Sequence, residues 1–146
     1  MKHLTLCAAL LLCSNAQAAT YVYQANAYQG HDGRCGGQLL PFQVTITVRK
    51  AIPPNSSNLI VSLKTLSIYA GENYQWGRRF NKQHTDGGAF TTDPDGHITE
   101  WNVAGATNHR RGFYTQNQTG DVRDFVQFMC GSAGGAGDPG TWTRTK

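Results

Sequence analysis

The chain has 146 residues, and its 13 Lys and Arg against 9 Asp and Glu give a formal net charge of +4. A net charge this small does not by itself indicate a nucleic-acid partner, and we expect none. The length suits one domain with a modest core, and the 17 glycines and the charged fraction of 15% are typical of a secreted β protein with a neutral polar surface.

The first 18 residues have the three parts of an export signal. Lys2 supplies the positive start, Leu4–Leu12 is the apolar centre, and Ala16–Ala18 is a cleavage site of the A-x-A type. We therefore expect residues 1–18 to be a signal peptide and residues 19–146 to form a single domain in the periplasm or outside the cell. The mature sequence contains no apolar stretch long enough to span a membrane as a helix.

Two of the four cysteines, Cys35 and Cys130, remain after removal of the leader. In an oxidising compartment two cysteines most simply form one disulfide. This bridge would close a loop of about 95 residues, which the chain-entropy model values at about 4–5 kcal/mol. The alternative is a pair of separate buried thiols.

Alternating apolar and polar residues predict the first strands. Residues 19–28 place Tyr21 and Tyr23 on one face, and residues 42–49 alternate strictly between apolar and polar. Such a strand has one dry face and one solvated face, as in an antiparallel sheet. The glycines of residues 29–37 predict a turn-rich loop between these two strands.

The middle of the chain continues the period of two. Two prolines in residues 52–58 predict an exposed connection. Residues 59–69 alternate again, but the apolar positions change parity near Lys64 and Thr65, which predicts a bulge. Residues 71–88 carry aromatic and basic residues without a clear period, and we expect an irregular strand or a long loop there.

A β-hairpin is predicted next. Asp93–Gly96 has the composition of a type I turn, with proline second and glycine fourth, between residues 89–92 and residues 97–103. In the outgoing strand Ile98 and Trp101 have opposite parity, so either both faces pack or the strand bulges.

The last third of the chain is predicted to hold short strands and one flexible segment. We expect a polar loop at residues 104–111, a short strand at residues 113–115 and a turn at residues 117–121. These are followed by a strand at residues 122–130, a flexible glycine-rich segment at residues 132–140 and a closing strand at residues 141–143. Seven to eight short strands without an amphipathic helix predict an all-β fold, either an antiparallel β-sandwich or a small β-barrel.

The sequence offers no catalytic constellation, and we assign no catalytic residue, metal ligand or cofactor from it. The four histidines of the mature chain lack the spacing of a zinc motif, and each lies beside turn residues. A secreted nuclease would need a proton donor, a proton acceptor and cations, for which His97, Glu100 and residues 109–111 are the candidates. His97 and Glu100 are three residues apart in a predicted strand, so they point to opposite faces, which counts against the pair.

Aromatic residues beside polar ones are better candidates for function. Aromatic faces with neighbouring Arg, Asn and Gln suit neutral polar ligands at a barrel mouth or a carbohydrate-stacking surface, although most rings in so small a chain are expected in the core. The aromatic candidates are Tyr69, Tyr74, Trp76, Phe80, Trp101 and Trp142. The residues predicted to bind are Trp76, Arg78, Arg79, His109, Arg110 and Arg111.

The run Gly96–Val103 contains the spacing G-x-I-x-x-W, and Gly140-Thr141-Trp142 lies near the end of the sequence. These features resemble uncharacterised exported β-domains of Gram-negative bacteria, including members of the PEP-CTERM group. The resemblance implies an exported all-β domain and supplies no catalytic residue. This sequence lacks the Pro-Glu-Pro motif, apolar helix and basic tail of that group, so the resemblance does not imply membrane sorting.

The sequence therefore predicts an exported, non-catalytic domain that binds a small ligand, a glycan or a protein partner. Two alternatives stay open. One is a small secreted hydrolase such as a nuclease, and the other is a periplasmic enzyme inhibitor that presents residues 108–113 as a loop.

Overall fold

The computed structural model describes residues 17–25, 42–70, 75–79, 87–108, 111–128, 131–136 and 139–146. These residues form ten strands and no helix. The strands are β1 (Ala19–Gln24), β2 (Phe42–Val48), β3 (Leu59–Ala70), β4 (Gln75–Arg79), β5 (Gly87–Thr92), β6 (Ile98–Asn108), β7 (Arg111–Gln118), β8 (Asp121–Phe128), β9 (Gly131–Ala136) and β10 (Thr141–Arg144).

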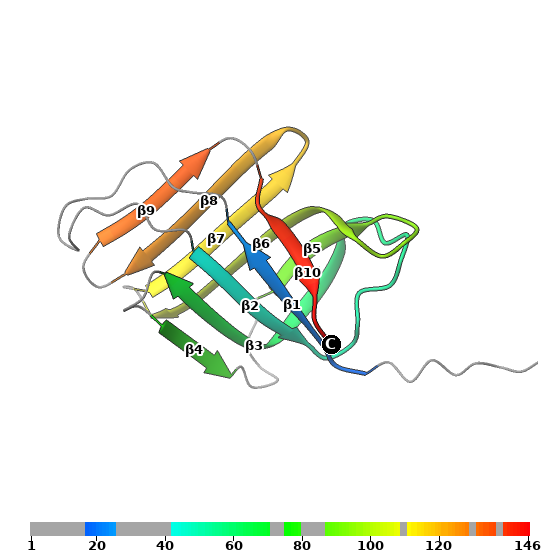
Figure 1. Ribbon diagram of the computed structural model, residues 1–146, viewed down its shortest axis with the longest axis horizontal. Coiled ribbons are helices and arrows are strands. Elements are labelled where there is room, and N and C mark those ends of the chain that lie inside the picture. Colours follow the sequence, from blue (N-terminus) through cyan, green and yellow to red (C-terminus); the bar gives the residue numbers. More distant parts are fainter. Residues whose placement is uncertain are drawn as a thin grey trace, which may run out of the picture.

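All these strands pair antiparallel in one sheet of order β10-β1-β2-β3-β5-β6-β7-β8-β9, with β4 beside β3. The sheet curls into a half-barrel, in which β1 and β10 cross in front of β6 (Figure 1). The predicted all-β, antiparallel class is confirmed. The described strands form a curled half-barrel, an arrangement between the sandwich and the closed barrel that were predicted.

The core lies on the concave, inner face of the half-barrel, and it is formed by alternate residues of the strands. Tyr21 and Tyr23 share the buried face of β1, as predicted, and the apolar residues of β2 alternate with half-exposed ones. Burying a side chain of this size contributes about 1.5–3 kcal/mol. The largest buried side chains include Tyr23, Val44, Ile46, Val48, Leu63, Leu66, Phe90 and Val103.

The bulge predicted in the second β-run is confirmed. Val48 pairs with Leu63 and Thr47 pairs with Thr65, so Lys64 is an additional residue in β3. The change of parity lets Leu63 and Leu66 both point inward. β3 then serves both halves of the sheet, because its first part pairs with β5 and its second part with β2 and β4.

The predicted hairpin turn between β5 and β6 is also confirmed. The Gly96 N–H donates to the Asp93 carbonyl oxygen at 3.0 Å, and Gly96 has a φ of 85°, which glycine adopts without steric cost. A second bulge follows, because Thr91 pairs with Glu100 and Thr92 with Ile98. Ile98 consequently packs partly against the core.

The connection at residues 52–58 was predicted to be exposed, and the structure corrects this at its first residue. Ile52 is buried, and its N–H donates to the Tyr21 hydroxyl at 2.9 Å. The rest of the segment is mostly exposed and lies along the hairpin turn, where the Asn55 N–H donates to the Asp93 carbonyl at 3.0 Å. An apolar residue beside the prolines is therefore part of the core.

Other segments of the chain are more regular than predicted. The glycine-rich segment predicted to be flexible forms β9 over residues 131–136, because backbone pairing with β8 requires no side chain. The polar loop predicted at residues 104–111 continues β6 as far as Asn108. Within the segment predicted as an irregular strand or long loop, residues 75–79 form β4.

The predicted disulfide partners Cys35 and Cys130 lie outside the described residues, as does most of the predicted leader. The bridge and the export signal therefore remain predictions. In the part of the chain that the structure describes, no helix has the length and apolar character needed to cross a membrane.

Candidate functional site

The residues predicted to bind fall on two parts of the chain. Trp76 and residues 78 and 79 lie in β4, whose backbone pairs with the second part of β3. Arg111 begins β7 and pairs with Asn108 across the turn from β6. Residues 109 and 110 lie outside the described residues, so a binding role for this set remains a prediction.

A buried acidic side chain, Asp124 of β8, lies on the inner face of the half-barrel and is 9% exposed. The hydroxyl of Tyr23, on β1, approaches both carboxyl oxygens of Asp124, at 3.0 and 2.8 Å. The two residues are 101 positions apart in the sequence. This hydrogen bond therefore joins the two halves of the curled sheet.

Two donor chains converge on the Asp124 carboxyl group. The Trp101 indole N–H donates to the Thr115 hydroxyl at 2.8 Å, and Thr115 in turn hydrogen-bonds to Asp124. The Gly140 N–H donates to the Tyr23 hydroxyl oxygen at 3.0 Å. The Tyr23 hydroxyl also hydrogen-bonds to Thr115, so Tyr23, Thr115 and Asp124 form one connected network of buried polar groups.

Burial dominates the titration of this network. Desolvation raises the pKa of Asp124 above its ordinary value, and the hydrogen bonds from Thr115 and Tyr23 offset part of that rise. Desolvation, together with the nearby Asp124 charge, also raises the pKa of the Tyr23 hydroxyl well above its ordinary value. No Lys, Arg or His among the described side chains hydrogen-bonds to Asp124 or forms an ion pair with it.

Replacing Thr115 with valine tests this network, because valine keeps the branched shape and loses the hydroxyl group. The Trp101 N–H loses its acceptor and Asp124 loses a donor, so we expect the free energy of unfolding to fall by about 2–3 kcal/mol. Urea denaturation measures the change. Thr45→Val, on the half-exposed face of β2, is the control and should change stability by less than about 0.5 kcal/mol. Equal effects of the two substitutions would contradict the network.

Aromatic rings pack around the buried network. The Tyr23 ring lies 5.6 Å from Trp101 and 5.1 Å from Trp142, measured between ring centroids, and Trp142 meets Phe90 edge to face at 5.7 Å. Trp101 is buried, as expected for most of the aromatic candidates. These contacts make Tyr23, Trp101 and Phe90 part of the core, with Trp142 packed partly against it.

The outer face of the same strands carries a second set of aromatic residues. Tyr114 of β7 and Phe125 of β8 are cross-strand partners, and Phe125 is 41% exposed. Their other partners in the row are small, because Ala104 pairs with Tyr114 and Gly134 pairs with Phe125. We call Tyr114 and Phe125 the aromatic pair. No large side chain flanks it within its row.

The next row on the outer face is polar. Asn102, Gln116 and Arg123 are successive cross-strand partners on β6, β7 and β8. Asp121 accepts a hydrogen bond from the Gln116 amide at 3.1 Å and another from the Arg123 guanidinium at 2.8 Å. We call Asn102, Gln116 and Arg123 the polar row. It offers amide and guanidinium groups beside the aromatic pair.

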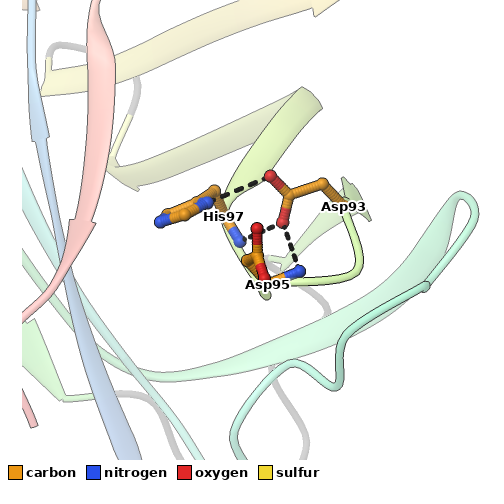
Figure 2. A group of neighbouring side chains, drawn as sticks. All are labelled: Asp93, Asp95 and His97. Atoms are coloured by element: carbon orange, nitrogen blue, oxygen red, sulfur yellow. Dashed lines mark hydrogen bonds and ion pairs between the residues drawn. The ribbon is translucent and has the colours of Figure 1, made fainter.

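The hairpin turn holds a third cluster, formed by Asp93, Asp95 and His97 (Figure 2). One potential ligand atom from each side chain lies within 4.8 Å of the others. However, Asp93 accepts from the N–H groups of Asp95 and His97 at 3.0 and 2.8 Å, and its other oxygen lies 3.0 Å from His97 Nδ1. The internal hydrogen bonds of the turn therefore account for this arrangement.

The turn cluster also bears on the nuclease alternative. Desolvation raises the pKa of Asp93, but the hydrogen bonds and charge of His97 outweigh it, and the pKa lies below its ordinary value. The His97 side chain is 77% exposed. In the described part of the chain, the hydrogen bonds of His97 to Asp93 lie within the turn and fix the imidazole there.

Sequence reasoning missed Asp124 and the aromatic pair, although strand parity carries a signal for each. Asp124 has the same parity as Val122 and Val126, which marks an acidic residue on an apolar face. Phe125 has the parity of Arg123, which marks an aromatic residue on a polar face.

Comparison of the chain with protein-family models, with curated proteins and with solved structures finds no match for any of the three.

Proposed function

We propose that this is a non-catalytic binding domain whose outer face binds a neutral, hydroxyl-rich ligand, and that the ligand is a glycan chain. The observation that carries the proposal is the aromatic pair, Tyr114 and Phe125, which stands between small residues and beside the polar row. Phe125 presents 41% of its surface to solvent at this position.

The chemistry of the two rows matches the two kinds of surface on a sugar. The C–H faces of a pyranose ring pack on aromatic rings, and its hydroxyl groups exchange hydrogen bonds with amides and guanidinium groups. Asp121 and Arg123 form an ion pair, so their charges offset one another. This balance favours a neutral ligand over an ionic one.

The small residues beside the aromatic pair favour a chain over a small molecule as the ligand. Ala104 and Gly134 continue the row of the aromatic pair, and Ala136 pairs with Arg123 at the end of the polar row. We infer that an extended ligand can cross these strands, because the residues that pair beside the aromatic pair are small in sequence. Small molecules are instead usually bound in enclosed pockets.

We expect Phe125→Ala to weaken glycan binding by about two- to tenfold, because an aromatic contact of this kind is worth about 0.5–1.5 kcal/mol. Screening the purified domain on a glycan array identifies the ligand, and titration calorimetry then compares the variants. Tyr69→Ala is the matched control, because Tyr69 is 42% exposed on β3, outside the proposed surface. It should bind as the unchanged domain does.

Three outcomes would count against this function. The first is a complete absence of binding on a broad array. The second is binding that is unaffected by both Phe125→Ala and Tyr114→Ala. The third is binding that Tyr69→Ala removes, which would place the surface on β3 and return attention to the neighbouring β4 and its predicted binding residues.

A further inference from the structure

Asp121 of β8 holds two side chains of the polar row by their nitrogen atoms. Its Oδ2 accepts from Gln116 Nε2 at 3.1 Å, and its Oδ1 accepts from Arg123 Nε at 2.8 Å. Gln116 and Arg123 are cross-strand partners, and Asp121 lies two residues before Arg123, on the same face of β8. One carboxylate therefore holds the amide and the guanidinium group side by side, next to the aromatic pair.

The carboxylate fixes which way round the Gln116 amide lies. An ionised carboxyl group only accepts hydrogen bonds, so the amide turns its nitrogen, and not its oxygen, toward Asp121. No hydrogen bond within the described part of the chain occupies the amide oxygen. Gln116 therefore offers a ligand a hydrogen-bond acceptor of fixed orientation.

Arg123 is held in the same way, but it offers donors. A guanidinium group has several N–H bonds, and the contact with Asp121 uses the one on Nε. The N–H bonds of the two terminal nitrogens are left for a ligand. The Arg123 and Asp121 side chains are 65% and 45% exposed, so a ligand can reach this pair.

The complement of an acceptor beside a donor is a pair of hydroxyl groups on neighbouring carbon atoms. One hydroxyl group donates to the Gln116 oxygen, and the next accepts from the Arg123 guanidinium group. We propose that the glycan-binding surface selects sugars that carry two adjacent free hydroxyl groups, and that Asp121 positions Gln116 and Arg123 for this selection. This inference rests on the proposed glycan-binding function.

The aromatic pair has a different part in recognition. Tyr114 lies two residues from Gln116 along β7, so both share the outer face. Phe125 lies two residues from Arg123 along β8 in the same way. The rings pack on C–H groups and do not distinguish one pattern of hydroxyl groups from another. Substitutions in the aromatic pair and in the polar row should therefore affect binding differently.

Two soluble glucose hexamers test the selection by titration calorimetry with the purified domain. Each internal sugar of the β-1,4-linked hexamer has adjacent free hydroxyl groups on C2 and C3, whereas the internal sugars of the β-1,3-linked hexamer have no adjacent pair. We expect the β-1,4-linked hexamer to bind about two- to tenfold more tightly, the factor that corresponds to one hydrogen bond.

Two substitutions test the roles of the polar side chains. Gln116→Met keeps the length of the side chain and removes the amide, so it should abolish the preference between the hexamers. Asp121→Asn keeps the shape and removes the charge that holds Gln116 and Arg123, so it should narrow the preference. The ratio of the two affinities is the readout, because a loss of folded protein would lower both affinities alike.

Two control variants separate selection from general binding. Gln43→Met replaces an amide on the outer face of β2, where Gln43 Nε2 donates to Gln24 Oε1 at 3.3 Å, outside the proposed surface. It should leave both affinities unchanged. Phe125→Ala should weaken the binding of both hexamers by the same factor, because the ring does not read the hydroxyl pattern.

Equal binding of the two hexamers to the unchanged domain would overturn the selection and leave the glycan-binding function in place. So would a preference that survives both Gln116→Met and Asp121→Asn. If neither hexamer binds, the ligands found on the glycan array decide: an adjacent pair of free hydroxyl groups in all of them supports the selection, and its absence overturns it. An array without any ligand would remove the proposed function itself.

Discussion

Replacing Gly140 with alanine is expected to lower the free energy of unfolding by about 3 kcal/mol, at the upper end of the usual cost of overpacking. An alanine Cβ would lie 2.7 Å from both Cζ and Oη of Tyr23 and closer still to the Gln24 carbonyl oxygen. Neither group can withdraw freely, because Gln24 is backbone within β1 and the Tyr23 hydroxyl is held by Asp124. Thermal and urea denaturation measure the loss.

Gly105→Ala is the comparison for this experiment. There a Cβ would meet Leu66 Cδ2 at 2.6 Å and Phe113 Cε1 at 2.8 Å, which are outer atoms of side chains that can rotate. We expect a smaller loss, about 1–2 kcal/mol, because the neighbours can repack. If Gly140→Ala costs no more than Gly105→Ala, Tyr23 is not fixed in the way described.

Removal of a single hydroxyl group at position 23 is the second substitution with a large expected effect. Tyr23→Phe keeps the aromatic ring, but it leaves Asp124 without one donor and the Gly140 N–H without its acceptor. We expect the free energy of unfolding at neutral pH to fall by about 1.5–3 kcal/mol, the range for hydrogen bonds to charged groups.

Tyr21→Phe provides an internal control two residues earlier on the same face of β1. The Tyr21 hydroxyl accepts a neutral bond from the Ile52 N–H at 2.9 Å, so its removal should cost about 1 kcal/mol. Urea denaturation of both variants measures the difference. A Tyr23→Phe variant as stable as Tyr21→Phe would show that the bond to Asp124 adds nothing.

Much of the strand pattern could be predicted from the sequence, because apolar and polar residues alternate along a strand that has one buried face and one exposed face. The bulge at Lys64 and the turn at Asp93–Gly96 were predicted on the same basis, from a change of parity and from turn composition. β9 could not be predicted this way. Its glycine-rich sequence has no alternation, and its strand exists because β8 offers a backbone edge.

The candidate sites were harder to predict, because each depends on register and topology. The position of Asp124 in its strand identifies it as an acidic residue on an apolar face. Its partner Tyr23, however, is 101 residues away and contacts it only because the sheet curls. The aromatic pair depends on the alignment of Tyr114 with Phe125 across two strands. Local sequence patterns do not specify which residues face each other between strands.

The inner network and the outer aromatic pair lie back to back. Thr115 pairs with Asp124, and the adjacent pair, on the opposite face of the same two strands, is Tyr114 with Phe125. The inner hydrogen bonds fix the strands that carry the outer rings. Because the strands are already held in place, less conformational entropy is lost when a ligand binds to the outer rings.

The additional residue in β3 has a consequence for how this shape is encoded. A chain lacking Lys64 would still place Leu63 and Leu66 on one face, since their spacing would return to strict alternation. Its hydrophobic pattern would be intact, yet β3 would lose the local twist and bend that a bulge provides. Lys64 thus adds to the local bend of β3, although its removal would not change the pattern of apolar residues.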